Sequence, residues 1–300
     1  MQKKVKSELI TVAIPVYNMA KSIVNAINSV IAQTYENIEI LIVNDGSTDN
    51  SMQIIRDNIH DPRLRIYERP ANGGVCAAMR DLVDQAKGTY ICFLDADDTM
   101  MPTRVEKQYN AIKNAEKYWA GRMVASFCGS LVNDIKKNTK YQINPFNLFS
   151  DLFGGGTGHS MYKVQDLQDL GNFDTHYSRS ADSAMCINFL LHNGFYAMVN
   201  EPLIVYNYIW DESKKKIAQE DRVGFLELQQ QVRAENPTNI YLRRFAGLPV
   251  DMSTQKSFTD IDLFGIKGLR LLSIQHKDNG VKHIIRLFGI IPLLRIKIKK

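Results

Sequence analysis

Three carboxylates that follow a short strand-forming segment have the spacing that most clearly suggests chemistry. Residues 89–94 are strand formers and lead directly into Asp95, Asp97 and Asp98. Ionised carboxylates this close together repel one another unless a cation or hydrogen bonds offset their charge. If the extended conformation persists, Asp95 and Asp97 point to the same side, because side chains in a strand alternate with period two.

Two oxygen ligands aimed at one point suggest Mg²⁺ or Mn²⁺, which favour carboxylate, water and phosphate oxygens. Mg²⁺ usually takes only one or two protein carboxylates and completes its coordination with substrate phosphates. We therefore predict a divalent metal at Asp95 and Asp97 that also binds a phosphate group. The alternative is a strand end capped by an acidic surface turn, and this segment alone does not separate the two.

A second candidate is Asp45, which lies in a turn-forming segment at residues 43–51. Gly46 permits a tight turn, and Ser47 or Asp49 could cap the next helix. A carboxylate at Asp45 could accept the imide N–H of a uracil or another polar group of a nucleotide. The alternative is that the whole segment is a helix-capping turn.

The elements that position these residues alternate in type over the first hundred residues. Strand-like apolar segments lie at 9–14, 38–43, 64–68 and 89–94, and helical patterns lie at 21–33, 50–58 and 74–87. This alternation predicts an α/β fold with a mostly parallel sheet covered by helices on both faces. Ligands bind outside the carboxyl ends of such strands, so Tyr17, Asp45 and Asp95 should line one crevice.

The alternation is lost in the second half of the chain. We expect a helix at 102–119, extended segments at 123–131 and 139–143, a helix at 183–192, and short strands at 196–199 and 203–208. These segments complete a domain at 1–213. Residues 214–280 are expected to form a mainly helical extension, and 281–300 a basic amphipathic tail.

Composition and charge narrow the class of protein. The chain is 45% hydrophobic, as expected of a globular protein, and its four cysteines show no CxxC pair, so neither a zinc site nor a disulfide framework is suggested. Reduced thiols, the lack of a signal-peptide pattern and the lack of an apolar run of roughly 18 to 20 residues predict a cytoplasmic protein without a transmembrane segment.

The net charge of +5 is concentrated at the C-terminus. Residues 281–300 contain six basic residues and no acid, which leaves 31 basic and 32 acidic residues elsewhere. This distribution argues against a nucleic-acid-binding core. Bulky apolar residues mixed with cations suit an anionic membrane surface, and the alternative is a terminal helix that docks on the body of the protein.

Four ordered motifs in the first hundred residues resemble those of the family 2 glycosyltransferases. They are Val12-Ala-Ile-Pro-Val-Tyr-Asn18, Val43-Asn-Asp-Gly-Ser-Thr-Asp49, Asn72-Gly-Gly74 and Phe93-Leu-Asp-Ala-Asp-Asp98. Each motif is weak alone, but the four in this order are a strong signal. The resemblance covers residues 8–210 and implies a GT-A fold, a nucleotide-sugar donor, a divalent metal and inversion at the anomeric carbon.

The resemblance also implies roles for single residues. Pro15 and Tyr17 would flank the nucleoside, Asp45 would contact the base, Asp95 the ribose or metal region, and Asp97 the metal. Asp98 would organise the loop. Residues 8–100 would then be the nucleotide-sugar-binding half of the domain, and 101–213 the acceptor half.

The catalytic base of the family lies in an acidic motif after a Gly-x-Phe-Asp segment. Here Gly171-Asn-Phe-Asp174 is followed by Asp182, which we predict as the general base, the alternative being a helix cap. Three departures concern donor and acceptor identity. Ala181 stands where the family commonly has Glu, Ala78-Met79-Arg80 replaces Ala-Arg-Asn, and Tyr206-Asn207-Tyr208 replaces a Tyr-Arg pattern.

These observations predict an inverting, metal-dependent enzyme that moves a hexose or N-acetylhexosamine. The donor would be a nucleotide-diphosphate sugar, most simply UDP-linked, and the acceptor a glycan or lipid-linked saccharide in cell-surface polysaccharide synthesis. Two rivals remain open. One is an inactive sugar-nucleotide-binding subunit of a membrane-associated complex, and the other is a nucleotidyltransferase. Donor sugar, acceptor and linkage depend on the shape of the pocket, which motifs do not determine.

Overall fold

The computed structural model describes residues 7–134, 139–143, 157–175, 181–192 and 194–208, together with three strands within 272–297. The chain divides into two compact units, residues 1–225 and 226–300. Each unit is described by itself.

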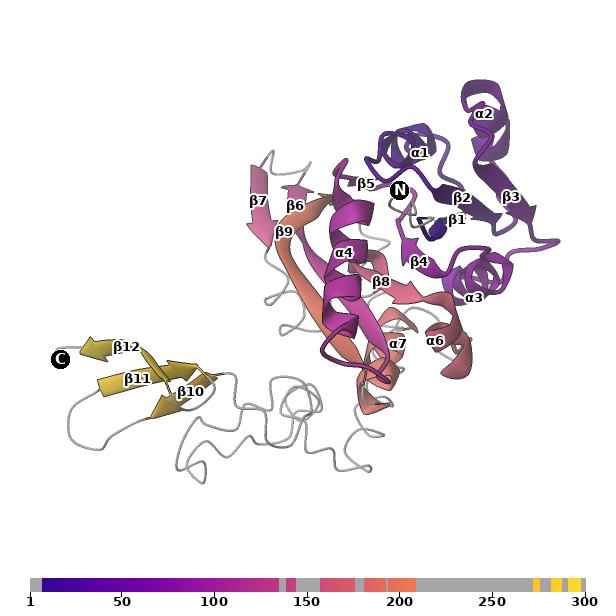
Figure 1. Ribbon diagram of the computed structural model, residues 1–300. Coiled ribbons are helices and arrows are strands. Elements are labelled where there is room, and N and C mark those ends of the chain that lie inside the picture. The colour runs from indigo at the N-terminus through magenta and orange to yellow at the C-terminus, as the bar shows by residue number, and fades with distance from the viewer. Residues whose placement is uncertain are drawn as a thin grey trace, which may run out of the picture. The chain divides into compact units, whose positions relative to one another are not determined.

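The first unit contains a nine-stranded mixed sheet with the order β3-β2-β1-β4-β8-β6-β9-β5, and β7 pairs with β6 at the side (Figure 1). The strands are β1 (Ile10–Val16), β2 (Ile38–Asn44), β3 (Leu64–Glu68), β4 (Tyr90–Phe93), β5 (Thr99–Met100), β6 (Val124–Asp134), β7 (Thr139–Ile143), β8 (Ser160–Lys163) and β9 (Phe195–Tyr208).

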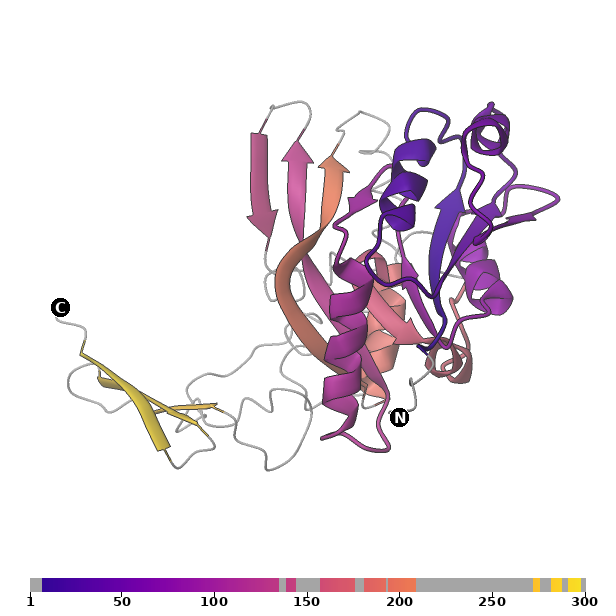
Figure 2. The same ribbon diagram turned by 45° about the horizontal axis from the view of Figure 1, so that its top comes forward.

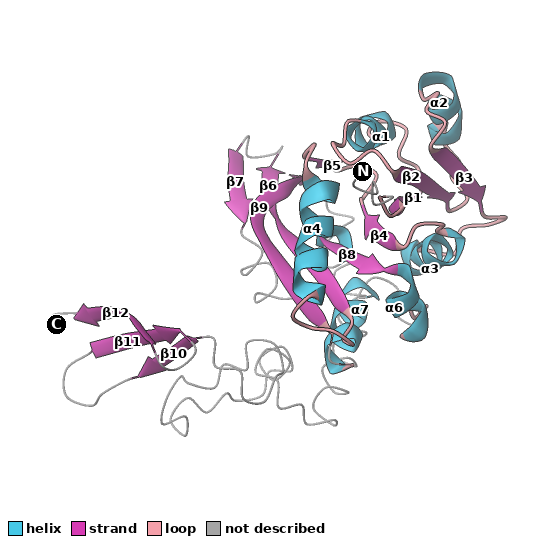
Figure 3. Cartoon of the chain, viewed as in Figure 1, coloured by secondary structure: helices cyan, strands magenta, loops and turns pink. Residues whose placement is uncertain are grey.

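Helices alternate with strands in the first half of the unit, as predicted (Figure 3). Strands β1 to β4 are mutually parallel, and β1 lies between β2 and β4. The helices are α1 (Ile23–Ile31), α2 (Ser51–Asn58), α3 (Val75–Gln85), α4 (Arg104–Glu116), α6 (Val164–Asp169) and α7 (Ala181–Leu191).

Burial explains why these segments fold as they do. Every residue of β2 and β4 is buried, as expected of strands covered on both faces. Helix α1 buries Ile23, Ala26, Ile27 and Val30, whose spacing of three and four residues forms one apolar face. The α/β fold and its parallel first half are therefore confirmed.

The second half mixes strand directions. Strand β8 runs antiparallel to both β4 and β6, whereas β6 and β9 are parallel. Helix α4 packs along β6 and β9, where Figure 2 shows it beside the long curved strands. The two short strands expected at 196–199 and 203–208 are in fact one strand, β9, with register shifts around Gly129 of β6. A bulge of this kind bends a strand without ending it, so the two pieces stay in one element.

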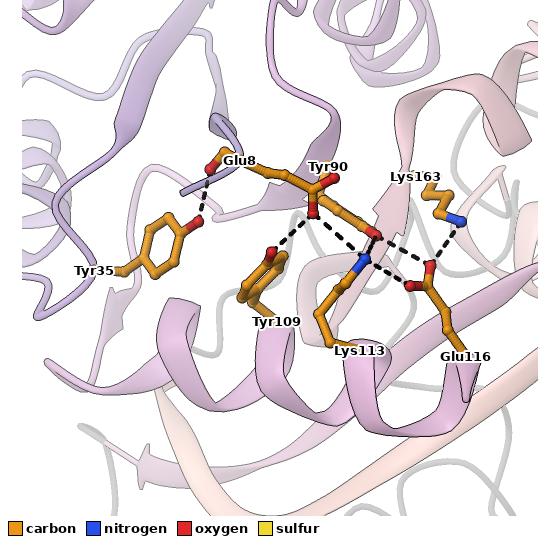
Figure 4. Close-up of polar contacts among 7 residues, drawn as sticks. All are labelled: Glu8, Tyr35, Tyr90, Tyr109, Lys113, Glu116 and Lys163. Carbon is orange, nitrogen blue, oxygen red and sulfur yellow. Dashed lines mark hydrogen bonds and ion pairs between the residues drawn. The ribbon is translucent and has the colours of Figure 1, made fainter. Parts of the chain in front are cut away.

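A network of polar side chains lies near the amino-terminal end of β4, away from the carboxyl ends of the parallel strands (Figure 4). Glu116 at the end of α4 accepts hydrogen bonds from Lys163 Nζ at 2.6 Å, Lys113 Nζ at 2.8 Å and Tyr90 Oη at 3.1 Å. Burial works to raise the pKa of Glu116, but the two lysines outweigh it and hold that pKa below its usual value. Tyr90 begins β4 and Lys163 ends β8, while Lys113 and Glu116 lie on α4. Because the network links these three elements, we assign it to the stability of the fold.

The second unit contains a three-stranded antiparallel sheet. It consists of β10 (Leu272–Gln275), β11 (Lys282–Leu287) and β12 (Ile291–Lys297) in that order. Most of the expected, mainly helical extension at 214–280 lies outside the described residues, and the part that is described, β10, is a strand. The mainly helical extension therefore stays a prediction. The predicted basic tail at 281–300 contains two paired antiparallel strands, β11 and β12.

Among the described residues, no helix is both long enough and apolar enough to cross a membrane.

Candidate active site

The candidate site begins where β1 lies between β2 and β4. The chain leaves β1 toward β2 on one side and later returns to β4 on the other, so the strand order reverses at this point. Such a reversal opens a crevice at the carboxyl ends of the strands. Tyr17, Asp45 and Asp95 follow the carboxyl ends of β1, β2 and β4, as predicted.

The loops after β1 and β2 are bound to each other. Asn18, with φ of 56°, accepts hydrogen bonds through Oδ1 from the backbone N–H groups of Thr48 at 2.8 Å and Asp49 at 3.2 Å. The left-handed conformation suits asparagine, whose side chain can bond to nearby backbone. Beside this joint, the Tyr17 side chain is 44% exposed, and Pro15 pairs with Val43 within the sheet. Tyr17 is therefore accessible to a ligand.

Asp45 is buried and organises the next loop. Its Oδ1 accepts from Arg69 Nη1 at 2.7 Å and from Gly73 N at 2.9 Å, and its Oδ2 accepts from Gly74 N at 2.9 Å. A carboxylate offers about four acceptor positions, so these bonds leave about one for a ligand. The predicted contact of Asp45 with a nucleotide base remains a prediction, and Arg69 joins it as a second polar group.

Gly46 allows the Asp45 loop to approach the Asn72 loop closely. It has φ of 68°, and a Cβ atom on it would lie only 2.7 Å from the backbone N of Asn72. A side chain there would be both strained and obstructed. The second and third sequence motifs therefore meet in space through this glycine.

The acidic segment is a turn and not a continued strand. Strand β4 ends at Phe93, and the backbone N–H of Asp98 donates to the Asp95 carbonyl oxygen at 3.0 Å, which closes a four-residue turn. The assumption that the extended conformation persists to Asp97 is therefore wrong. The turn leaves Asp95 exposed and Asp97 partly exposed, while Asp98 is buried.

Asn207 of β9 holds the acidic turn from the far side of the sheet. Its backbone N–H donates to Asp98 Oδ1 at 2.9 Å, and its Nδ2 donates to the Asp97 carbonyl oxygen at 2.8 Å. Its own Oδ1 accepts from Asn133 Nδ2 at 3.1 Å. Asp98 thus organises the loop, as the resemblance implied.

The electrostatics of the turn fit a bound cation. Burial raises the pKa of Asp98 to about 8, and the neighbouring charges of Asp95 and Asp97 add to the increase. A cation at Asp95 and Asp97 would relieve this repulsion. Among the described residues, no group of three or more His, Cys, Asp or Glu side chains could hold a metal ion.

Asp182 lies in the first turn of α7 and is partly buried. Burial raises the pKa of its carboxyl group, and the hydroxyl of Thr157, which donates to Oδ1 at 2.6 Å, opposes that increase. Thr157 belongs to η1 (Thr157–His159), a short 3₁₀ turn before β8. A carboxylate with a raised pKa and a fixed orientation can act as a general base.

The departures from the family pattern have structural roles. Met79 is buried within α3, while Arg80 Nη1 donates to the Phe173 carbonyl oxygen at 3.0 Å. In return, Asn172 Nδ2 donates to the Arg80 carbonyl oxygen at 3.1 Å and to Asp84 Oδ1 at 2.8 Å. The helix of the third motif is therefore attached to the segment that leads to Asp182. Ala181 is buried as well.

Three residues of this site were not predicted from the sequence. Arg69 follows β3, so applying the carboxyl-end rule to that strand also would have found it. Thr157 lies in a glycine cluster at 154–158, and Asn207 stands at a departure from the family pattern, so the sequence draws attention to both places. It does not predict their contacts with Asp182 and the acidic turn, which come from distant parts of the chain.

Comparison with known proteins identifies the family. The sequence model described as Glycosyl transferase family 2 matches residues 11–171, which is more than half of the chain. The chain belongs to this family. The match contains all four motifs together with η1.

One relative is an uncharacterized glycosyltransferase of Rickettsia prowazekii, which is 34% identical over 150 residues. The aligned part covers 50% of this chain and 45% of that protein, so the chain spans about half the length of this curated relative.

Two solved structures show the same GT-A fold. TarS of Staphylococcus aureus, in complex with UDP-GlcNAc, has a TM-score of 0.56 and 17% identity, covering 68% of this chain and 59% of that one. The mannosyltransferase PcManGT of Pyrobaculum calidifontis, in complex with GDP-Man and Mn²⁺, has a TM-score of 0.53 and 19% identity, covering 81% and 69%. At these identities the likeness concerns the fold alone.

Proposed function

We propose that this protein is a metal-dependent, inverting glycosyltransferase, and that it moves a hexose or N-acetylhexosamine from a UDP-linked sugar. The acceptor would be a glycan or a lipid-linked saccharide in cell-surface polysaccharide synthesis. One observation carries the proposal. Thr157 of η1 donates a hydrogen bond to Asp182, and the next residue, Gly158, lies near Asp95, because a Cβ atom placed on it would be 3.9 Å from Asp95 Oδ2. One short turn is therefore close to a carboxylate of the proposed donor side and to the proposed base.

Each part of the crevice has a task in this proposal. Tyr17 and Pro15 would flank the nucleoside, and Asp45 with Arg69 would bind the base. Asp97 and Asp95 would hold Mn²⁺ or Mg²⁺, which when bound neutralises negative charge on the departing nucleoside diphosphate. Asp98 and Asn207 keep the turn in place.

Asp182 would perform the proton transfer. Its carboxylate would take the proton of the acceptor hydroxyl while that oxygen attacks C1 of the sugar from the face opposite the phosphate, which inverts the anomeric centre. The hydrogen bond from Thr157 aims one carboxylate oxygen and leaves the other available for the acceptor.

A screen of UDP- and GDP-linked sugars, each with and without Mn²⁺, tests the proposal. We expect a UDP-sugar to raise the melting temperature most in the presence of Mn²⁺, and UDP to be released on transfer or slow hydrolysis. Binding without turnover on any acceptor would instead support an inactive sugar-nucleotide-binding subunit. Release of pyrophosphate would support a nucleotidyltransferase. A preference for GDP-sugars would contradict the UDP assignment.

We further propose that the protein is cytoplasmic and contacts an anionic membrane through residues 281–300. The support is the charge of this segment, which carries six basic residues and no acid. Each lysine or arginine near an anionic surface contributes about 1 kcal/mol, so changing all six to glutamine should weaken binding to anionic vesicles by more than about 100-fold. Neutral vesicles are the control, and unchanged binding to anionic vesicles would contradict the proposal.

A further inference from the structure

The turn η1 contacts Asp182 and lies close to Asp95. Thr157 Oγ1 lies 2.6 Å from Asp182 Oδ1, and a Cβ atom on Gly158 would lie 3.9 Å from Asp95 Oδ2. A shift of this turn would therefore change the position of the proposed base relative to the acidic turn. The residues that hold η1 in place should therefore affect the rate of the proposed reaction.

Two side chains of α4 hold the backbone of η1. Arg104 Nη2 donates to the Gly158 carbonyl oxygen at 2.7 Å, and Gln108 Nε2 donates to the His159 carbonyl oxygen at 2.9 Å. Arg104 and Gln108 lie one helical turn apart and bind each other, because Arg104 Nε donates to Gln108 Oε1 at 2.9 Å. They act as one unit.

Arg104 also holds the segment that leads into the acidic turn. Its Nη1 donates to the carbonyl oxygen of Phe93, the last residue of β4, at 3.0 Å. One guanidinium group therefore binds the backbone at Phe93, two residues before Asp95, and the backbone at Gly158, next to Thr157. The planar fork of arginine can reach acceptors in separate directions, which an ammonium group on a flexible stem does less well.

The burial of Arg104 calls for an explanation. Its side chain is fully buried, with 0% exposure, and its charge is close enough to Asp98 to oppose the rise in the pKa of that carboxyl group. Burying a charge in this way costs free energy that a neutral side chain of similar size would avoid. Its hydrogen bonds to two functional segments supply a reason for its presence.

We propose that Arg104 is a positioning residue that fixes η1 between Asp95 and Asp182. It binds neither donor nor acceptor and acts through the backbone of Phe93 and Gly158. Gln108 supports it by orienting the guanidinium and binding His159. This inference rests on the proposed function for its effect on turnover, but its structural part can be tested without turnover.

The test compares Arg104→Lys and Arg104→Met with the matched control Arg56→Met. Arg56 is exposed on α2, where it pairs with Glu68. The first measurement is amide hydrogen exchange in the full-length protein. In both Arg104 variants, exchange should increase at least about tenfold in the peptide that contains η1, and stay unchanged in β1 and β2, because a lost hydrogen bond loosens the turn locally. A uniform increase throughout the fold, or none, would overturn the proposal.

The second measurement is steady-state kinetics with the donor found in the screen. We expect kcat to fall by about 10- to 100-fold, since small displacements of reacting groups have effects of that size. KM for the nucleotide sugar should change less than about twofold, because no group that contacts the donor has been altered. If the apparent kcat falls only in proportion to the fraction of protein that is folded and active, Arg104 has a purely structural role and the proposal is rejected.

The two measurements separate the two proposals. If the wild-type protein transfers no sugar, the proposed function fails while the exchange experiment still tests the role of Arg104. If Arg104→Met does not fold, Arg104→Lys keeps the charge, loses the fork and carries the test alone.

Discussion

Asp182→Asn is expected to lower kcat for sugar transfer by about 10²- to 10⁴-fold, the usual contribution of a general base. Binding of UDP in the presence of Mn²⁺ should remain, because the proposed function assigns UDP and the metal to the acidic turn and not to Asp182. Asparagine has nearly the same shape and still accepts the hydrogen bond from Thr157, so only the ability to take a proton is lost. Steady-state kinetics and calorimetry measure the two effects.

The control for this variant is Asp169→Asn, which changes an exposed carboxylate on α6 that binds Gln165. It should keep normal activity. If Asp182→Asn turns over as fast as the wild type, Asp182 is not the general base, and the alternative that it caps helix α7 is supported. Loss of UDP binding together with activity would indicate that the substitution damages the fold.

The pH dependence of kcat follows from the surroundings of Asp182. Burial raises the pKa of this carboxyl group, and a base must be ionised to act, so activity should fall on the acid side at a pH above the usual aspartate value of about 3.9. Thr157→Val removes the hydrogen bond that favours the ionised form. The acid limb should therefore move to higher pH in that variant, and a limb that stays in place would contradict this role of Thr157.

Asp97→Ala is expected to abolish the dependence of UDP binding on Mn²⁺. Metal ions contribute several kcal/mol to reactions with developing charge, so transfer should fall by at least about 100-fold. The contact between Asn207 and the acidic turn should survive, because it uses the carbonyl oxygen of Asp97 and not its side chain. Calorimetric titration of UDP with and without Mn²⁺ measures the effect.

Asp57→Ala is the matched control, because Asp57 is an exposed carboxylate on α2 that contacts Gln53. It should keep the Mn²⁺ dependence of the wild type. An unchanged Mn²⁺ titration in Asp97→Ala would exclude Asp97 as a metal ligand. In that event Asp95 would be the remaining ligand of the proposed pair.

The first half of the fold could be predicted from local pattern. Continuous apolar segments became β1 to β4, and the amphipathic pattern around Ile23 and Ile27 became α1. These predictions succeed because a fully buried strand and a one-sided helix each have their own periodicity. The second half was predicted less well. Strand β8 and helix α6 were missed, and β9 was divided in two, because their neighbours come from distant parts of the sequence.

The same division holds within the candidate site. The motif residues Tyr17, Asp45 and Asp95 could be assigned to one crevice from the sequence, since each directly follows a predicted parallel strand and the carboxyl ends of such strands share an edge. The acidic turn shows the limit of that approach. Periodicity alone suggested that the strand continues through the acidic residues, whereas a backbone hydrogen bond between Asp98 and Asp95 forms a turn. Asn207, more than a hundred residues away in the sequence, donates a hydrogen bond to this turn.

Residue type and short-range order were thus sufficient for the family, for the parallel half of the sheet and for the positions of Tyr17, Asp45 and Asp95 after the carboxyl ends of its strands. Only the folded chain brings Thr157 to Asp182, Asn207 to Asp98 and the buried Arg104 beneath η1. The physical reason is that these contacts are single hydrogen bonds between segments far apart in sequence. Such contacts follow no periodic pattern and no fixed spacing in the sequence. They form only when the folded sheet brings the two segments within hydrogen-bonding distance.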